Sequence, residues 1–466
     1  MGGVTEMAEF KGRHSEMRVL QNKLNSNDFQ MVVLYGRRRI GKTKLMSEFM
    51  QKQNCKCVSY TAVEQSEKEQ LAIMTETVLN ALAPELADII QFPSFEKLFE
   101  FIGSKAQNER IIFFIDEYPY LAKQCPYIQS VLQKIIDTVW KSTKLYFVIC
   151  GSLVSFMKDE VLAESAPLHG RATLEMKLQP FNYLDTAEFV PNYSSEEKAI
   201  VYGLTNGVAK YIEQFDNSKS LEQNIIDEFF EFGGYFTEEQ IKTVITSEKQ
   251  NPALYNSIIS AIATGHTRNS EIASCVGMDD ITYPLKMLQK AEIIEKRVAK
   301  TPYYILLDSM LIFWFKFVNK AISIINMGKG EKYYHTSVAD QLHDYMGAVY
   351  EKICKEYLML KAGEGPYPIV TELDNYQKTI LDDEGKQKPI EIDILGKNGK
   401  DILLIGECKF KNEKVDKATF DRFLEKVRYV KARNPLVCMF SLAGYTEYVK
   451  ENAGNVLLLT TDDLFA

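Results

Sequence analysis

The chain has 466 residues, of which 46% are hydrophobic and 25% are charged, and it carries a net charge of −8. A chain of this length exceeds a single core, and at about 100–200 residues per domain it predicts three domains. The acidic balance, with a pI near 5.5, excludes a whole-molecule attraction to nucleic acid or anionic membranes but not a local basic surface.

Sequence features of secreted and membrane proteins are missing. The first residues lack the apolar stretch of a signal peptide. The most apolar stretch, residues 303–327, is interrupted by Asp308, Lys316 and Lys320, so we expect a buried core segment and no membrane partner. The eight cysteines are scattered, and none of them completes a zinc site. This pattern predicts a protein of the reducing cytoplasm.

Short apolar runs alternate with helical patterns over the first part of the chain. The runs are rich in β-branched and aromatic residues and occupy residues 31–35, 57–61, 111–115 and 145–150. Alternation of this kind predicts a parallel sheet with helices on both faces. Farther on, helical patterns lead into a strand hairpin at 389–395 and 401–408. The predicted fold class is α/β, with three domains at 1–215, 216–307 and 308–466.

A glycine-rich loop follows the first apolar run. Its pattern, G-x-x-x-x-G-K-T, is formed by Gly36, Arg37, Arg38, Arg39, Ile40, Gly41, Lys42 and Thr43. Glycines let backbone amides approach phosphates, and a helix expected from about Lys44 favours negative charge at its N-terminus. We expect Lys42 to reach the β- and γ-phosphates of ATP and the Thr43 hydroxyl to bind Mg²⁺. The alternative, a chance glycine–lysine loop, is disfavoured by the position between strand and helix.

Two acidic residues, Asp116 and Glu117, directly follow the third apolar run. At the end of a buried strand, Asp116 is placed to hold the Mg²⁺ shell and Glu117 to polarise the attacking water as a general base. The alternative is a pair of solvated loop acids. Because the pair follows a phosphate-binding loop along the chain, it predicts ATP hydrolysis as well as ATP binding.

Two further residues are candidates for contacts with the γ-phosphate. Ser152 follows the fourth run, where a hydroxyl would lie beside the acidic strand, although a Gly-Ser turn is in itself nonspecific. Arg171 lies on a loop before an expected strand at 173–178. Arginine stabilises charge developing on phosphoryl oxygens, either in its own subunit or in a neighbour. A surface or salt-bridged arginine is the alternative.

Together with Phe10-x-Gly12-Arg13-x-x-Glu16, these motifs resemble the archaeal-type ATPases of the AAA+/STAND group. In that family the segment borders the adenine, which implies nucleotide contacts for Phe10, Gly12 and Arg13. A later Gly-x-Pro motif of the family also touches the base. Here the matching stretch departs from the family pattern, with Ala209 in place of the proline.

The middle part of the chain resembles a winged helix-turn-helix. Three helical patterns and two wing strands follow one another at 255–263, 269–277, 280–291, 294–298 and 303–307. DNA binding through a recognition helix at 281–290 is one interpretation. Between Asn251 and Leu307, however, six Lys/Arg face five Asp/Glu, whereas phosphate binding needs a concentrated positive face. A lid or a protein-contact module is the alternative.

The hairpin strands carry acidic and basic residues on shared faces. Glu391 and Asp393 share one face of the first strand, and Glu407 and Lys409 share a face at the end of the second. Two or three carboxylates with a lysine can hold Mg²⁺ and position a water for attack on a phosphodiester. A surface salt-bridge ladder is the alternative.

This arrangement resembles the PD-(D/E)xK restriction-endonuclease-like fold. Asp393, Glu407 and Lys409 match the motif, and Ile392 stands where that family has a proline. The resemblance implies a further carboxylate from an upstream helix, for which Glu351 is the candidate. It also implies that Glu351, Asp393 and Glu407 bind the metal.

The expected protein is an ATPase whose ATP and Mg²⁺ site is coupled through a winged helix to a metal-dependent nuclease-like domain acting on DNA or RNA. The competing hypothesis is a nucleotide-driven switch that binds protein partners and has a non-catalytic nuclease-like domain. A role for Arg171 in a neighbouring ATP site would also imply a homo-oligomer.

Overall fold

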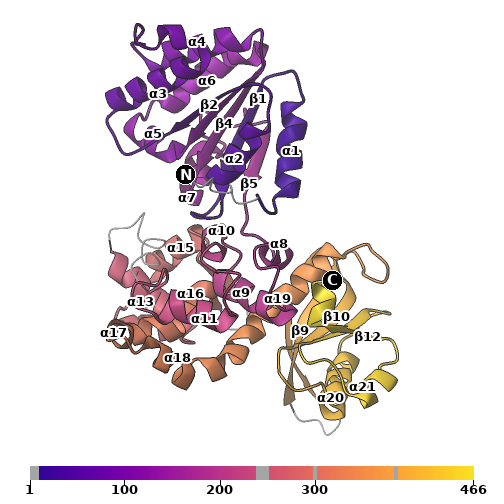
Figure 1. Cartoon of the computed structure of the whole chain (residues 1–466). Coiled ribbons are helices and arrows are strands. Elements are labelled where there is room, and N and C mark those ends of the chain that lie inside the picture. Colours follow the sequence, from indigo (N-terminus) through magenta and orange to yellow (C-terminus); the bar gives the residue numbers. More distant parts are fainter. Residues whose placement is uncertain (1–9, 238–250, 298–301, 382–386) are drawn as a thin grey trace. The chain divides into compact units, whose positions relative to one another are not determined.

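Figure 1 shows the computed structural model of the chain, which describes residues 10–237, 251–297, 302–381 and 387–466. The chain forms two compact units. The first unit contains the described residues up to Phe181 together with Val208–Lys210 and Thr282–Ile294. The second consists of Asn182–Gly207, Tyr211–Ile281 and Glu295–Ala466. Because these units cross the expected domain borders, the three-domain division stays a prediction.

The first unit is built on a parallel five-stranded sheet with strand order β2-β3-β4-β1-β5. Its strands are β1 (Gln30–Tyr35), β2 (Lys56–Thr61), β3 (Ile111–Asp116), β4 (Leu145–Gly151) and β5 (Leu174–Lys177). Parallel strands end at one edge of the sheet, where the loops after β1, β3 and β4 come together. The predicted α/β fold with a parallel sheet is confirmed.

Helices cover both faces of this sheet (Figure 1). The helices of this part of the chain are α1 (His14–Leu24), α2 (Lys42–Gln51), α3 (Glu67–Leu82), η1 (Pro84–Leu86), α4 (Phe95–Ala106), α5 (Tyr118–Gln124), α6 (Ile128–Thr138), η2 (Trp140–Ser142), α7 (Val154–Phe156) and the π-helical turn η3 (Met157–Val161). The first unit also contains α15 (Thr282–Lys290), which comes later in the chain.

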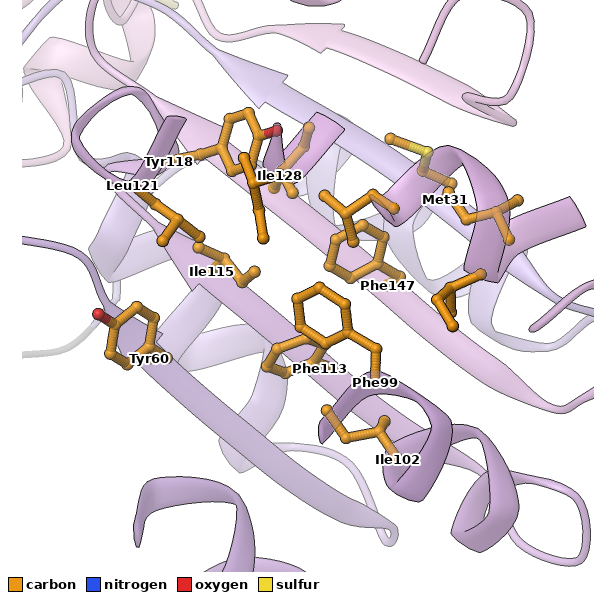
Figure 2. Packing of buried hydrophobic residues seen from close by; sticks show 14 of the residues in the cluster. Met31, Tyr60, Phe99, Ile102, Phe113, Ile115, Tyr118, Leu121, Ile128 and Phe147 are labelled. Atoms are coloured by element: carbon orange, nitrogen blue, oxygen red, sulfur yellow. The ribbon is translucent and has the colours of Figure 1, made fainter. Parts of the chain in front are cut away.

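The sheet is buried on both faces because successive strand residues point to opposite sides. On one face, Phe113 of β3 and Phe147 of β4 pack with Phe99 of α4, as Figure 2 shows. On the other face, the ring of Tyr146 lies 6.0 Å from that of Phe49 in α2. Double burial explains the continuous apolar runs, and each large apolar side chain contributes about 1.5–3 kcal/mol.

The second unit begins with helices. They are α8 (Tyr183–Ala187), α9 (Ser195–Thr205), α11 (Leu221–Ile225), η4 (Ile226–Phe230), α13 (Pro252–Ala263), α14 (Asn269–Val276), α16 (Ser309–Phe313), η5 (Trp314–Val318), η6 (Asn319–Ala321), α17 (Ile322–Asn326), α18 (Gly330–Ser337), η7 (Ala339–Gln341) and α19 (Leu342–Leu360). Their core is aromatic, and the ring of Phe313 lies 5.2 Å from Phe229 and 5.3 Å from Tyr345.

Two short elements begin in the first unit and continue into the second: α10 (Ala209–Ile212) and β6 (Ile294–Arg297). β6 pairs with β7 (Tyr303–Leu306). The order α13, α14, α15, β6, β7 is the order expected for a winged helix, which itself stays a prediction. Val298, the expected end of the first wing strand, lies outside the described residues.

A second five-stranded sheet, with order β12-β11-β10-β9-β8, ends the chain. Its elements are β8 (Glu372–Leu381), β9 (Gln387–Asn398), β10 (Asp401–Lys409), α20 (Lys417–Arg428), β11 (Leu436–Ser441), α21 (Glu447–Glu451), β12 (Val456–Thr460) and α22 (Thr461–Leu464). β8, β9 and β10 are antiparallel, whereas β10, β11 and β12 are parallel. Phe420 and Phe423 of α20 pack on this sheet. None of the described helices has the length and apolar character needed to cross a membrane.

Candidate functional site

The loop between β1 and α2 has a backbone that depends on glycine. Gly36 has φ 155° and Gly41 has φ 93°, a region that residues with a side chain rarely adopt. A Cβ on Gly36 would lie 2.5 Å from the carbonyl oxygen of Leu178. The helix begins at Lys42, slightly earlier than expected. The loop therefore ends directly at a helix N-terminus, which favours a bound phosphate.

Lys42 is buried within this loop. Its ammonium group donates hydrogen bonds of 2.9 Å to the carbonyl oxygens of Gly36 and Arg37. Burial lowers the pKa of Lys42, and neighbouring thiol and carboxylate groups counteract that shift. A phosphate bound here would offer Lys42 charged oxygens in place of these two neutral carbonyl oxygens. Hydrogen bonds to charged acceptors are stronger than those to neutral ones.

Thr43 and Asp116 meet between the first turn of α2 and the end of β3. The Thr43 hydroxyl donates a 2.6 Å hydrogen bond to Oδ2 of Asp116. The other carboxylate oxygen, Oδ1, accepts the backbone N–H of Glu117 at 2.9 Å. Hydroxyl and carboxylate oxygens are the ligands that Mg²⁺ prefers in nucleotide sites. This donor set fits a Mg²⁺ ion held beside nucleotide phosphates.

Ser152 lies directly after β4, the strand that runs between β1 and β3. Its hydroxyl is 2.9 Å and 2.8 Å from the two carboxylate oxygens of Glu117, to which it donates. Glu117 has φ 50°, and the N–H of Gly36 donates to the carbonyl of Gly151 at 3.4 Å. The strand order thus brings the predicted serine and glutamate together beside the phosphate-binding loop.

Arg13 is anchored to the same loop. Its guanidinium carbon lies 4.1 Å from the ring centre of Phe181, and Nη2 donates a 3.0 Å hydrogen bond to the carbonyl of Ile40. Nη1 donates to Glu16 at 3.0 Å. Its neighbour Gly12 has φ 64°. Sequence reasoning missed Phe181, because no local pattern links it to Arg13.

Three further residues of the predicted nucleotide-binding motifs, Ala209, Arg38 and Lys44, lie in or beside the loop. The N–H of Lys210 donates to the carbonyl of Arg39 at 3.2 Å, so the stretch with Ala209 lies against the loop although it lacks the proline. The Arg38 guanidinium donates to the Tyr120 hydroxyl at 2.9 Å. Lys44 is an exposed residue in the first turn of α2.

Phe10 is the first described residue of the chain, and its ring centre lies 5.7 Å from the ammonium nitrogen of Lys52 in α2. This contact places Phe10 against the helix that follows the phosphate-binding loop. Its expected contact with a nucleotide base stays a prediction.

Arg171 lies at the opposite edge of the sheet from this loop. Thr173 is hydrogen-bonded to the backbone of Met31, and five residues at about 3.3 Å each separate Met31 from Gly36. The Arg171 guanidinium instead donates to Oδ2 of Asp137 at 2.5 Å. The contacts within this chain therefore favour the salt-bridged alternative.

Comparisons with known proteins agree with this geometry. A family model described as an ATPase domain predominantly from Archaea matches residues 10–215. The uncharacterized ATP-binding protein MJ0423 of Methanocaldococcus jannaschii is 40% identical over 50 residues, which are 11% of this chain and 85% of that protein. Residues 10–215 match an archaeal ATPase domain, and the sheet of the first unit has the P-loop ATPase fold.

Similarity to one relative extends over nearly the whole chain. The uncharacterized protein MJECL04 of the same organism is 29% identical over 475 residues, covering 97% of this chain and 99% of that protein. The Walker-type ATPase PABY2304 of Pyrococcus abyssi shares the fold with a TM-score of 0.51 at 18% identity, covering 66% of this chain and 96% of that chain. A second family model, of archaeal and bacterial proteins of unknown function, matches residues 314–420.

A second cluster of charged residues lies where β9 and β10 separate in the C-terminal sheet. The paired residues run as far as Gly406 opposite Ile394. Beyond them, Oδ2 of Asp393 accepts the backbone N–H of Cys408 at 2.8 Å and lies 4.0 Å from the Lys409 ammonium. The structure thus brings the predicted aspartate and lysine together.

Glu407 forms the buried part of this cluster, with a residue exposure of 3%. Its Oε1 accepts hydrogen bonds from Lys409 at 2.8 Å and from Lys426 of α20 at 2.7 Å. Its other oxygen, Oε2, is buried and accepts no hydrogen bond from any described residue. Burial, together with the charge of Glu407, raises the pKa of Asp393. Lys426 was not predicted, because the motif does not extend into α20.

Two of the predicted carboxylates have other partners. Glu391 accepts a 2.9 Å hydrogen bond from Gln377 of β8. Glu351 of α19 accepts one of 2.7 Å from Asn375, and burial raises the pKa of its carboxyl group. Among the described residues, no group of three or more His, Cys, Asp and Glu side chains is placed to hold a metal ion. The role of Glu351 as a third metal ligand stays a prediction.

Proposed function

We propose that this protein hydrolyses Mg²⁺-ATP with Glu117 as general base, and that its C-terminal sheet is a metal-dependent nuclease-like domain acting on nucleic acid. Bound Mg²⁺ would neutralise phosphate charge at the ATP site. Lys42 binds phosphate oxygens, Thr43 and Asp116 provide oxygen ligands, and Glu117 takes a proton from the attacking water. Ser152, which donates to both Glu117 oxygens, orients that base.

The observation that carries the nuclease-like proposal is the buried, unpartnered Oε2 of Glu407. An unpaired buried carboxylate oxygen costs about 1–3 kcal/mol or more, so a fold that retains one has a use for it. Asp393 and Lys409 lie beside it, and the three residues supply two carboxylates and an ammonium group. This is the donor set needed to hold a divalent cation and to orient a water for attack on a phosphodiester.

The expected recognition helix is a poorer candidate for nucleic-acid contact. Lys290 of α15 is paired with Asp159 at 2.8 Å, and Arg297 of β6 is paired with Asp374 at 3.0 Å. Side chains already held by carboxylates have to break these pairs before they can bind phosphates. The contacts favour a role in joining protein elements, so we assign nucleic-acid binding to the C-terminal cluster.

Contacts within each unit also support coupling between the two sites. Lys210 in the first unit bonds to the phosphate-binding loop through Arg39. A few residues earlier, Asn206 in the second unit accepts a 3.1 Å hydrogen bond from Lys352 of α19. The preceding residue of α19, Glu351, accepts a hydrogen bond from Asn375 of β8, which pairs with the strand that carries Asp393. A short backbone segment therefore joins the ATP site to the helix beside the second cluster.

The test is cleavage of plasmid, linear duplex, single-stranded DNA and RNA by the purified chain with Mg²⁺ or Mn²⁺. Asp393→Ala is expected to abolish cation-dependent cleavage, because it removes one of the two carboxylates. Glu391→Ala is the matched control on the same strand, since Glu391 bonds to Gln377 outside the cluster. Cleavage that persists in Asp393→Ala, or none by the wild type on any substrate, would refute the proposal.

A further inference from the structure

The carboxylate pair of the C-terminal cluster is neutralised by two ammonium groups from different elements. Lys409 belongs to β10, beside Glu407, whereas Lys426 comes from α20. Both donate to the same oxygen, Oε1 of Glu407. Two carboxylates and two ammonium groups sum to zero charge, so the cluster has little net attraction for a divalent cation in this arrangement.

The two lysines differ in how firmly they are held. Lys409 reaches both carboxylates, since its ammonium nitrogen lies 2.8 Å from Glu407 and 4.0 Å from Asp393. Lys426 forms its ion pair with Glu407, at 2.7 Å, and reaches it from the separate helix α20. The two lysine side chains are about equally exposed, at 27% and 29%. A lysine ammonium on a flexible four-carbon stem changes partners easily. Lys426 is therefore the group that can leave Glu407 for an anion on the solvent side.

We propose that Lys426 is a phosphate-responsive counter-ion that couples nucleic-acid binding to divalent-cation binding at the Asp393–Glu407 pair. Without nucleic acid, Lys426 holds Glu407 and opposes the cation through its positive charge. A phosphate of the nucleic-acid backbone offers the Lys426 ammonium group another charged acceptor, so the ammonium group can leave Glu407 for the phosphate. The carboxylate pair then carries a net negative charge and binds the cation. This inference rests on the proposed nuclease-like function.

Thermodynamic reciprocity makes the coupling measurable without any catalysis. If nucleic acid raises the affinity for the cation by some factor, the cation raises the affinity for nucleic acid by the same factor. Calorimetric titration with Ca²⁺, with and without a short phosphorothioate DNA duplex or its RNA counterpart, measures this factor on the full chain. Ca²⁺ binding that is lost in Asp393→Ala is assigned to the cluster, which separates it from cation binding at the ATP site.

Lys426→Met is expected to bind Ca²⁺ about tenfold more tightly than the wild type without nucleic acid, because one opposing charge is gone. Its coupling factor should fall towards one. Lys426→Arg should keep most of the coupling, and Lys431→Met, at an exposed residue beyond α20, should behave as the wild type. The intact pair of Lys409 and Glu407 keeps Glu407 partnered in these variants.

Ca²⁺ affinity and coupling that are unchanged in Lys426→Met would overturn the inference and leave the nuclease-like proposal standing. Weaker Ca²⁺ binding in Lys426→Met would also overturn it. Lys426 would then hold Glu407 in place as a Ca²⁺ ligand instead of opposing the cation. Equal Ca²⁺ binding by the wild type and Asp393→Ala would instead refute the proposed metal site itself.

Discussion

The side chains proposed for ATP hydrolysis lie in pairs that the sheet brings together. Glu117 is held by Ser152, and Asp116 is held by Thr43, although each pair joins different parts of the sequence. Glu117→Gln is expected to lower kcat for ATP hydrolysis by about 10²–10⁴ while ATP still binds, because a general base contributes that much. Turnover of radiolabelled ATP and equilibrium binding of a fluorescent ATP analogue check this.

Lys42→Ala provides the comparison for that experiment. It removes the charged group inside the loop and should abolish nucleotide binding itself. Hydrolysis that stays at the wild-type rate in both variants would contradict the assignment of the site.

A buried glutamate gives a prediction about pH. Glu356 of α19 accepts hydrogen bonds from the Tyr202 hydroxyl at 2.5 Å and the Tyr183 N–H at 3.1 Å, and burial raises its pKa. The folded state therefore binds this proton more tightly than the unfolded chain does. Its contribution to stability is full below the ordinary glutamate pKa of about 4.3 and is lost as the pH rises through the raised value.

Glu356→Gln should remove this loss. In urea unfolding at a series of pH values, the free energy of unfolding of the wild type should fall relative to that of Glu356→Gln as the pH rises above about 4.3. Glu364→Gln is the control, since Glu364 is exposed. A constant difference between wild type and Glu356→Gln across the series would contradict the account.

At the residue scale, the sequence identified neighbouring side chains where a short motif contains them. Lys42, Thr43 and Asp116 follow from the loop pattern and from one acidic strand end, and the structure brings them together. It failed where partners are distant in the sequence, as for Arg13 with Phe181 and Glu407 with Lys426. No local pattern reports such contacts, because they depend on how elements pack.

At the scale of elements, apolar runs locate the strands of the nucleotide-binding sheet well. β1 and β3 are buried on both faces, so their runs are continuous, and the observed bounds differ from the predicted ones by a single residue at one end. β8 went unpredicted, because many of its residues are polar and exposed. β12 is a short apolar run, and periodicity alone does not separate such a run from a buried helix segment.

The packing of α4 on this sheet yields a stability prediction. Phe99 is fully buried, with its ring 6.2 Å from Phe113 and 5.5 Å from Trp140. Phe99→Ala should cost about 3–5 kcal/mol, since it removes a large buried ring and leaves a cavity. Chemical denaturation followed by tryptophan fluorescence checks this. Ile73→Ala, at an exposed position of α3, is the control, and an equal effect of both changes would contradict the packing.

At the scale of the whole molecule, α19 is the element through which the two sites are expected to communicate. Lys352→Met should leave ATP turnover and ATP-free cleavage within about twofold, because the contact lies outside both sites. The change that ATP makes in the cleavage rate should shrink. An undiminished ATP effect in Lys352→Met would exclude the contact with Asn206 as part of the coupling.

The most direct test of the central claim is the rate of Mg²⁺-dependent nucleic-acid cleavage by the intact chain, measured with and without ATP. If the two sites are coupled, ATP should change the cleavage rate severalfold in the wild type and leave it unchanged in Lys42→Ala. Cleavage should disappear in Asp393→Ala. ATP turnover without cleavage of any DNA or RNA substrate would contradict the central claim. That result would point to a nucleotide-driven switch that acts through protein contacts.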